Sequence, residues 1–258
     1  MLFRSWLLAT DPDNLGKQGN WQLAPRPEAV RASVPWIIQD PFPGYHGLAW
    51  YWRSFTPPVN PYEGGRTLLR FGQVDYLAEV WLNGVPVGGH EGGETPFELD
   101  VTDTLKPGQE NLLAVRVLNP THSRIDDMVL AETPHRCKVM PYSAGAAYNH
   151  GGITGSVELA LAPPVRLAGL YVRPYADSGK ARVRFIARNT QNKPVAASFI
   201  LTIAPDTALS SLPCQPTTLA KTLAPGDNEV EVWLSVDSPH LWNLDDPFLY
   251  RARVQMDC

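Results

Sequence analysis

Large apolar residues alternate with polar ones in short runs along the whole chain. In residues 181–188, ARVRFIAR, Val183, Phe185 and Ala187 share one face of an extended strand that the arginines do not share. This period of two is typical of β-strands with one buried face. Comparable runs predict strands at residues 50–55, 67–71, 77–84, 97–101, 112–118, 156–161, 165–174, 181–188, 197–203, 229–236 and 249–256, with a further candidate at 215–222.

Turn signals separate these runs. Asn83-Gly84 stands between LAEVWL and VPVGGH, and Asn-Gly favours the type I′ turn of a tight hairpin because both central residues need positive φ. No segment has the pattern of a helix of normal length, and the 25 prolines among 258 residues disfavour long helices and central parallel strands. The chain is therefore expected to be all-β, built from antiparallel sandwiches.

A double proline, Pro163-Pro164, marks the expected domain boundary. Residues 1–163 suit a jelly-roll sandwich, and residues 164–258 suit an immunoglobulin-like sandwich, which usually has about seven strands. Only five or six strands are evident in the second domain, so we expect it to lack its last strand. A six-strand sandwich that needs no further strand is the alternative.

Charge and composition limit the classes of binding partner that the sequence leads us to expect. The net charge of −4 gives no reason to expect nucleic acid or an acidic membrane surface. No apolar run approaches the ~18 residues of a spanning helix, and the N-terminal run before Asp11 reads as a first strand rather than a signal peptide. These features leave the compartment open, with the cytoplasm favoured. Three widely spaced cysteines predict no disulfide framework.

Catalytic and metal motifs are absent from the sequence. His90-Glu91 lacks the second histidine of a zinc-binding helix, and its following glycines predict a loop. The six histidines show no ligand spacing, so no metal and no cofactor is expected. The carboxylate pairs Asp126-Asp127 and Asp245-Asp246 lie in turn-like sequence and are interpreted as turns or solvated pairs.

Two loops combine polar and aromatic side chains, as a sugar site requires, because a flat aromatic ring stacks on a pyranose. They are 39–47, QDPFPGYHG, and 141–152, PYSAGAAYNHGG. The alternative is structural: Phe42 and Tyr45 seal one end of the sandwich, and the second loop is a satisfied turn. The candidate substrate-binding residues are Gln39, Asp40, Tyr45, His46, Tyr148, Asn149 and His150.

Several strings occur together in a familiar order: WYWRSF, DYLAEVWLNGVPVGGHEGGETPFELDVTDTL, GQENLLAVRV, NHGGITGSVEL and SPHLWNLDDPFLYRARV. Together they cover nearly the whole chain, which resembles the N-terminal part of glycoside hydrolase family 2, the family of β-galactosidases, β-glucuronidases and β-mannosidases. The resemblance implies a galactose-binding-like jelly roll followed by an immunoglobulin-like domain.

The resemblance also implies a partner. In the family a TIM barrel follows these two domains and carries both catalytic glutamates, so no catalytic residue is expected in this chain. Loops corresponding to 39–46 and 142–150 reach the active site in the family. Its familiar members have an acidic residue where this chain has Ala146, and often an arginine where it has Thr154-Gly155, which marks a divergent branch.

Three functions are therefore considered. The first is the non-catalytic N-terminal portion of a family 2 glycosidase, which binds a β-glycoside together with a barrel absent from this chain. The second is a free-standing carbohydrate-binding module, which needs an exposed aromatic platform. The third is a structural adhesion or spacer module that binds no sugar.

Overall fold

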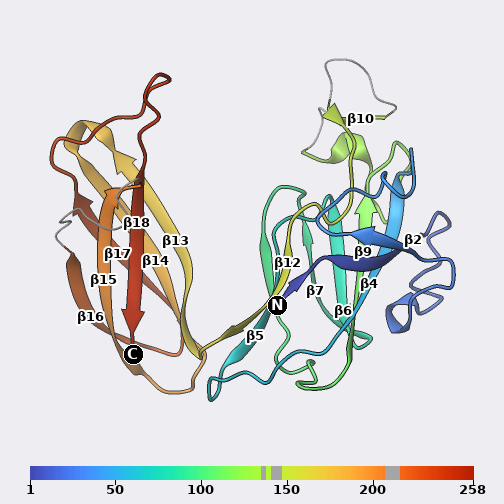
Figure 1. Ribbon diagram of the computed structural model, residues 1–258, viewed down its shortest axis with the longest axis horizontal. Coiled ribbons are helices and arrows are strands. Elements are labelled where there is room, and N and C mark those ends of the chain that lie inside the picture. The colour runs from blue at the N-terminus through green and yellow to red at the C-terminus, as the bar shows by residue number, and fades with distance from the viewer. Residues whose placement is uncertain (135–137, 141–146, 207–215) are drawn as a thin grey trace. The chain divides into compact units, whose positions relative to one another are not determined.

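The computed structural model describes residues 1–134, 138–140, 147–206 and 216–258. The chain divides into two compact units, one of Met1–Pro61 with Arg66–Ala162 and one of Tyr62–Gly65 with Pro163–Cys258. Both consist of strands, joined by single 3₁₀ turns at η1 (Trp21–Leu23), η2 (Leu130–Glu132) and η3 (Ala176–Ser178), so the all-β prediction is confirmed (Figure 1). Across the described part of the chain, no helix is long and apolar enough to cross a membrane.

The first unit is a jelly-roll sandwich of a six-stranded and a four-stranded antiparallel sheet. Its core lies between the two sheets and collects buried side chains from both. The larger sheet has the order β3 (Val30–Ser33), β2 (Ser5–Thr10), β4 (Gly47–Phe55), β9 (Asn111–Asn119), β6 (Leu77–Leu82) and β7 (Val85–Glu91). The smaller has the order β1 (Leu2–Phe3), β12 (Val157–Ala162), β5 (Arg66–Phe71) and β8 (Phe97–Asp100).

The central strands β4 and β9 are buried on both faces. Trp50 and Trp52 point away from the main core and form a second apolar cluster with Ala114, against which Trp21 packs. The indole Nε1 of Trp50 donates to the Asp11 carboxylate at 3.0 Å, so its polar atom is satisfied in this buried position. A segment that covers the outer face of the sheet therefore explains why β4 is a continuous apolar run rather than an alternating one.

Arg116 lies on the same outer face of β9 and is buried to 1% exposure. Its guanidinium forms ion pairs with Glu79 and Asp126 and donates to Asn14 Oδ1 at 2.8 Å. Burial alone would raise the pKa of Asp126, but the hydrogen bonds from Arg116 and Asn14 outweigh it and hold that pKa below its ordinary value. Asp126 has the left-handed backbone of a turn, as its sequence suggests. Its carboxylate also neutralises the buried charge of Arg116.

The hairpin prediction is confirmed. Asn83 and Gly84 have φ of 55° and 79° and connect β6 directly to β7. The glycine-rich loop predicted at His90 begins only at Gly92, because β7 extends to Glu91 and pairs His90 with Ala78. A glycine is needed at position 89 of this edge strand, because a Cβ there would lie 2.4 Å from the Ala78 carbonyl oxygen.

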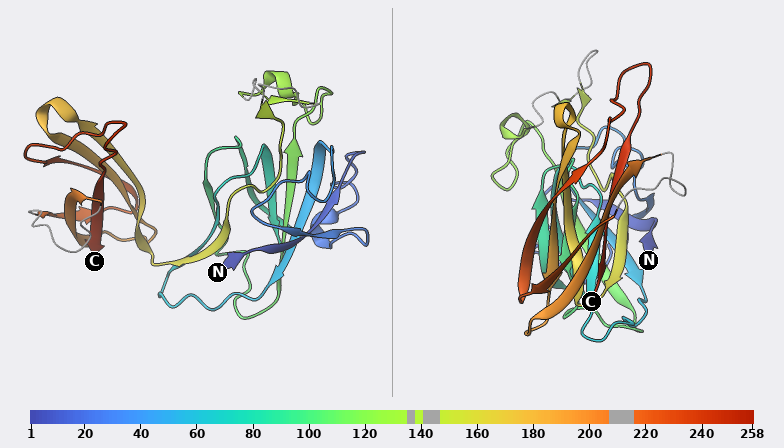
Figure 2. Two further views of the ribbon diagram at one scale, coloured as in Figure 1. Left: turned by 45° about the horizontal axis from the view of Figure 1, so that its top comes forward. Right: turned by 90° about the vertical axis from the view of Figure 1, so that its left-hand side faces the viewer.

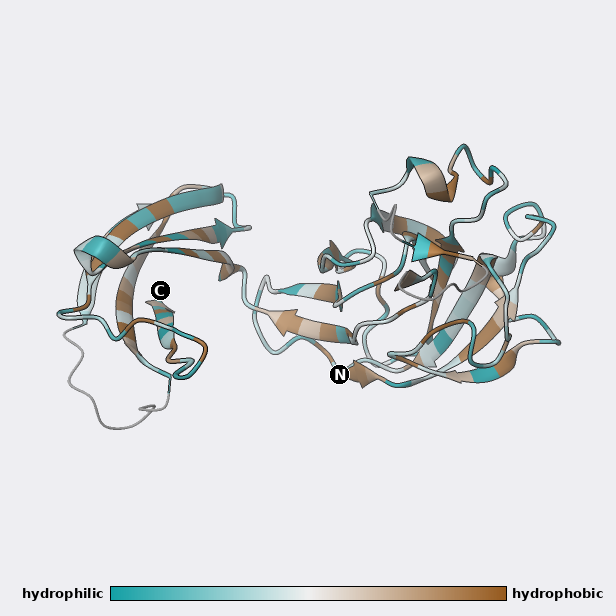
Figure 3. Ribbon diagram, turned by 90° about the horizontal axis from the view of Figure 1, so that it is seen from above, coloured by the Kyte–Doolittle hydropathy of each residue, from teal (hydrophilic) through white to brown (hydrophobic). Residues whose placement is uncertain are grey.

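The second unit contains two three-stranded antiparallel sheets that enclose their own apolar core (Figure 2). The predicted buried face of β14 (Lys180–Asn189) is confirmed, since Val183, Phe185 and Ala187 are all fully buried. The arginines on the other face pair with acidic residues of β17 (Gly226–Ser235), as in the Arg188–Asp227 pair at 2.6 Å. Hydrophobic and hydrophilic bands alternate along these strands in Figure 3. One sheet has the order β13 (Val165–Tyr175), β14 (Lys180–Asn189) and β17 (Gly226–Ser235), and the other β16 (Thr217–Leu223), β15 (Val195–Pro205) and β18 (Tyr250–Asp257).

Candidate functional site

The two loops singled out from the sequence meet at one end of the first unit. Residues 34–46 lead into β4, and residues 149–156 lead into β12, while a short parallel pair, β10 (Lys138–Val139) and β11 (Ala147–Tyr148), lies beyond the same end (Figure 1). The N–H of Ile38 donates to the Gly151 carbonyl at 2.8 Å, and the N–H of Trp36 donates to the Ile153 carbonyl at 3.0 Å. The backbone itself therefore joins the loops.

A buried chain of side-chain amides strengthens this junction. Gln39 Nε2 donates to Asn119 Oδ1 at 3.1 Å, and Asn119 Nδ2 donates to Asn149 Oδ1 at 3.1 Å. Gln39 Oε1 accepts the N–H of Gly151 at 3.2 Å, and Asn149 Nδ2 donates to the Pro120 carbonyl at 2.7 Å. Asn119 ends β9 and is fully buried, so one strand terminus anchors both loops.

The Gly151-Gly152 pair is required by close packing at this junction. A Cβ on Gly151 would lie 2.3 Å from the Asn119 side chain. Gly152 has φ of +127°, and a Cβ there would lie 2.8 Å from the Tyr51 hydroxyl. Side chains at these positions would separate the loops, because neither Asn119 nor Tyr51 has room to move within the core.

An aromatic cluster lies next to the amide chain. The rings of His46 and Tyr148 are 5.4 Å apart, and those of Tyr148 and His150 are 4.7 Å apart, both edge to face. Tyr148 and His46 are half-buried, and His150 is exposed. Burial lowers the pKa of His46, and the nearby His150 and His122 lower it further, although hydrogen bonds with backbone groups oppose this. We name His46, Tyr148 and His150 the aromatic cluster.

Tyr45 and Asp40 differ in exposure. The Tyr45 ring packs against the main core, and its hydroxyl donates to the Leu48 carbonyl at 2.6 Å. Burial raises the pKa of Tyr45 to about 12, so it stays neutral. The side chain of Asp40 is exposed in the turn after Gln39. The structure therefore unites the two loops and engages the amides of Gln39 and Asn149 in the protein. It leaves Asp40 and His150 exposed, with His46 and Tyr148 half-buried.

Sequence reasoning missed Asp75 and Lys138. They form an ion pair in which both side chains are nearly buried, and Lys138 Nζ also donates to the His150 carbonyl at 3.4 Å. The backbone of Asp75 exchanges hydrogen bonds with Gly152 at 2.7 and 2.8 Å. Neither residue belongs to a recognisable motif, so only the fold reveals that they support the second loop.

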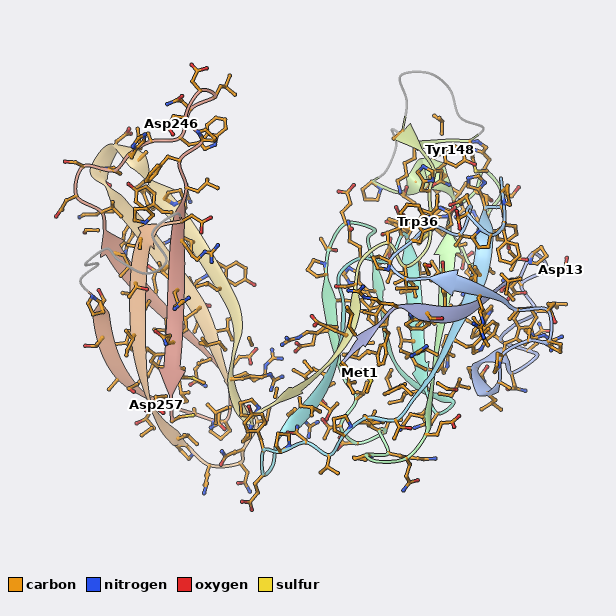
Figure 4. All side chains as sticks on the ribbon, viewed as in Figure 1. Met1, Asp13, Trp36, Tyr148, Asp246 and Asp257 are labelled. Atoms are coloured by element: carbon orange, nitrogen blue, oxygen red, sulfur yellow. The ribbon has the colours of Figure 1, made fainter. Side chains whose placement is uncertain are left out.

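Trp36 was missed as well. Its side chain is 55% exposed, and its backbone contacts place it at the loop junction. Trp36 and Tyr148, both labelled in Figure 4, lie toward the same end of the first unit. The sequence signal that could have identified it is a tryptophan in the proline-containing segment before Gln39, because aromatic rings in loops are candidates for sugar stacking.

The chemistry that these residues offer is binding chemistry. The exposed imidazole of His150, indole of Trp36 and carboxylate of Asp40, with the half-buried phenol of Tyr148, offer groups that can hydrogen-bond hydroxyls or stack on sugar rings. Among the described residues, no three His, Cys, Asp or Glu side chains converge as metal ligands. Ala146 and the rest of 141–146 lie outside the described residues.

Comparison with known proteins gives the family. Residues 4–163 match the family described as "Glycosyl hydrolases family 2, sugar binding domain", and residues 165–258 match "Glycosyl hydrolases family 2". A β-glucuronidase of Paenibacillus borealis is 31% identical over 179 residues, covering 65% of this chain and 29% of that protein. A β-galactosidase of Thermoanaerobacter pseudethanolicus is 27% identical over 215 residues, covering 82% of this chain and 26% of that protein.

Solved structures agree on the fold. A glycosyl hydrolase family 2 member from Bacteroides cellulosilyticus superposes with a TM-score of 0.74 at 23% identity, covering all of this chain and 34% of that one. A putative β-galactosidase from Bacteroides fragilis gives a TM-score of 0.74 at 22% identity, covering all of this chain and 38% of that one. The chain thus spans less than two fifths of the length of these relatives. With both of its units matched, the chain belongs to glycosyl hydrolase family 2.

Proposed function

We propose that this chain acts as the non-catalytic N-terminal portion of a family 2 glycoside hydrolase, an enzyme that hydrolyses O-glycosidic bonds of β-glycosides. In this proposal the two units, divided near residue 163, support a catalytic barrel, and the first unit contributes loop residues to the sugar site. The observation that carries the proposal is the junction of residues 34–46 with 149–153, locked by Asn119 and lined by exposed polar and aromatic groups.

The candidate residues divide into two roles under this proposal. Gln39 and Asn149 are positioning residues, because their amides hold the loops together from within. Tyr45 is also a positioning residue, since its ring packs against the core. Asp40, Tyr148 and His150 are the groups that would contact a sugar, because they combine hydrogen-bonding capacity with full or partial exposure, whereas the Nε2 atom of His46 is buried.

The first test measures the chain alone. Purified protein is incubated with aryl β-galactoside, β-glucuronide and β-mannoside substrates, and no turnover is expected. Turnover that co-purifies with the chain through successive columns would contradict the proposed non-catalytic role.

The second test concerns the barrel. The gene is read beyond codon 258, the longer product is expressed, and its kinetics are compared with those of Asp40→Ala and Tyr148→Ala variants. We expect KM for the preferred glycoside to rise about tenfold, as loss of one or two good contacts costs on the order of 1.4 kcal/mol. Gln109→Ala, an exposed amide of the first unit, is the control. A stop codon directly after Cys258, or loop variants that leave kinetics unchanged, would refute the proposal.

The aromatic cluster also supports a second candidate, a carbohydrate-binding module that acts by itself. Tyr148 and His150 provide neighbouring exposed or half-exposed rings, which is the arrangement that sugar stacking uses. Calorimetric titration of the chain with monosaccharides and oligosaccharides distinguishes the two functions. Binding that Tyr148→Ala abolishes would favour the module, and the absence of heat with every sugar would exclude it.

A further inference from the structure

The outer face of one sheet in the second unit carries charged and aromatic side chains that the proposed function does not use. β14 is the middle strand of this sheet, and Lys180, Arg182 and Arg184 point away from the core because they alternate with the buried Ala181 and Val183. Residues directly opposite one another on neighbouring strands share a face. The register therefore places on this face Tyr171, Arg173 and Tyr175 of β13, Lys180, Arg182 and Arg184 of β14, and Glu231, Trp233 and Ser235 of β17.

Positive charge exceeds negative charge at one end of this face. Arg182 Nη1 lies 3.9 Å from Glu231 Oε2, which makes a loose ion pair. Among the described residues, Arg173 and Lys180 have no ion-pair partner. Arg173 also lies directly opposite Arg182 in the ladder, where like charges repel each other. A bound anion would relieve this repulsion.

Aromatic rings lie among these cations. The ring of Trp233 is 5.2 Å from that of Tyr175, and the Arg173 guanidinium lies 5.3 Å from the centre of the Tyr175 ring. Tyr171 holds the Arg184 guanidinium at the same distance. Cation–π contacts restrict these arginine side chains, so a ligand that binds them loses less conformational entropy. Trp233 is 49% exposed, and about half of its surface is therefore available to a ligand.

We propose that this face binds an acidic polysaccharide whose sugar rings carry carboxylates, at a patch distinct from the loop junction of the first unit. The guanidinium fork of arginine matches a carboxylate bidentately, and an exposed indole stacks on the C–H face of a pyranose. We name Arg173, Tyr175, Lys180, Arg182 and Trp233 the basic aromatic patch.

The register brings the two kinds of contact within reach of one sugar. A carboxylate between Arg173 and Arg182 would neutralise the two facing cations. Trp233 lies directly opposite Arg182 on the next strand, with the two Cβ atoms about 5 Å apart, so the ring that carries the carboxylate can pack on the indole. Lys180, the next outward residue of β14, would meet the carboxylate of a neighbouring sugar.

An acidic polypeptide is the competing ligand for this patch. A stable protein interface has a desolvated core that is depleted of charged residues. Here the middle strand presents charged side chains at three successive outward positions, Lys180, Arg182 and Arg184, so this face offers no such core. An acidic polysaccharide does not require one, because every sugar supplies its own carboxylate and its own apolar ring face.

The experiment measures binding of the full chain to three polymers by calorimetric titration. Polygalacturonate has sugar rings and carboxylates, its methyl-esterified form keeps the rings without the charge, and polyglutamate has the charge without the rings. We expect saturable binding of polygalacturonate that weakens as salt concentration rises, because the pairing charges are exposed. The other two polymers should bind at least about tenfold more weakly, since each lacks one of the two kinds of contact.

Matched variants test the position. Arg173→Glu places a carboxylate opposite Arg182, where it occupies the site of the anion, and should weaken binding by more than about tenfold. This variant should fold at least as stably as the parent, because an attractive pair replaces a repulsive one. Trp233→Ala should weaken binding about tenfold through loss of the stacking ring. Arg253→Ala removes an exposed arginine from β18 in the other sheet and should leave affinity within about twofold.

Four outcomes would overturn the proposal. The first is no saturable binding of polygalacturonate at low salt, and the second is equally tight binding of polyglutamate, which would make an acidic polypeptide the ligand. The third is unchanged binding by Arg173→Glu and Trp233→Ala variants that circular dichroism shows to be folded. The fourth is binding by the chain that is lost in a longer gene product, because the remainder of the enzyme would then cover this face.

Discussion

Asn119 is the side chain on which the geometry of the candidate site depends. It is fully buried at the end of β9, and it is hydrogen-bonded to Gln39 from one loop and Asn149 from the other. Replacing Asn119 by alanine removes both contacts, and replacing it by aspartate keeps the shape but removes the amide donor. We expect both variants to loosen the loop junction.

The loss in free energy of unfolding can be derived from the hydrogen-bond partners that remain in the Asn119→Ala variant. Gln39 Nε2 also donates to the Tyr45 carbonyl at 2.7 Å, so it keeps a partner in the alanine variant and loses about 1 kcal/mol. Asn149 Oδ1 would lose its donor in a buried position, which costs about 1–3 kcal/mol. The sum is about 2–4 kcal/mol, or roughly 5–15 °C in Tm for a unit of this size if the whole unit unfolds with the junction.

Two measurements separate global from local effects. Urea unfolding gives the free energy of the unit, and native-state hydrogen exchange reports the amides of Ile38 and Gly151, whose hydrogen bonds cross the junction. A local loss of 2–4 kcal/mol would accelerate their exchange roughly 30- to 900-fold. Gln109→Ala is the control because its side chain is exposed. If both Asn119 variants unfold within about 0.5 kcal/mol of the parent and exchange is unchanged, the assigned role of Asn119 is wrong.

The other predictions concern the core, a buried charge and a titrating side chain. Phe185→Ala, which removes a fully buried ring packed 5.0 Å from Phe199, should cost about 3–5 kcal/mol by urea unfolding, and a cost below 1 kcal/mol would contradict the core assignment. Arg116→Met should cost about 1–3 kcal/mol at pH 7, because Glu79 and Asp126 lose their guanidinium partner, although both carboxylates are partly exposed and Glu79 keeps its ion pair with Lys17. The lowered pKa of Asp126 adds stability above its ordinary value of 3.8 that is lost as the pH falls through the lower, folded value, so the variant should show a weaker loss in acid titration. His46 has a lowered pKa, so its contribution is complete above about pH 6.5 and is lost as the pH falls through the folded value. His46→Gln should flatten this part of the stability curve, and an unchanged curve would show that His46 does not contribute to it.

Local patterns were sufficient to predict much of the fold. Alternation along residues 181–188 identified the buried face of β14, and Asn83-Gly84 identified the hairpin, because period-two burial and positive φ depend on neighbouring residues alone. The same logic fails for β4, where Trp50 and Trp52 are buried by a segment distant in the chain. It also misplaces the start of the loop after β7, because the edge strand continues through His90 to Glu91.

The candidate site shows the same division. The sequence alone indicated two loops that mix aromatic and polar residues, since composition marks a binding loop wherever it lies. The tertiary structure was needed to show that Gln39 and Asn149 face inward toward Asn119, while Tyr148 and His150 remain partly or fully exposed. The Asp75–Lys138 ion pair likewise joins residues that have no sequence signal.

The strand pattern, the hairpin turn and the resemblance to glycoside hydrolase family 2 could all be read from the residues alone, and the comparisons established that the chain belongs to that family. The three-dimensional structure was needed to show which polar side chains hold the loops, how Arg116 is neutralised and which segment covers the outer face of β4. The physical reason is that burial and hydrogen-bond satisfaction are set by partners far apart in the chain, whereas turns and alternation are set by neighbours.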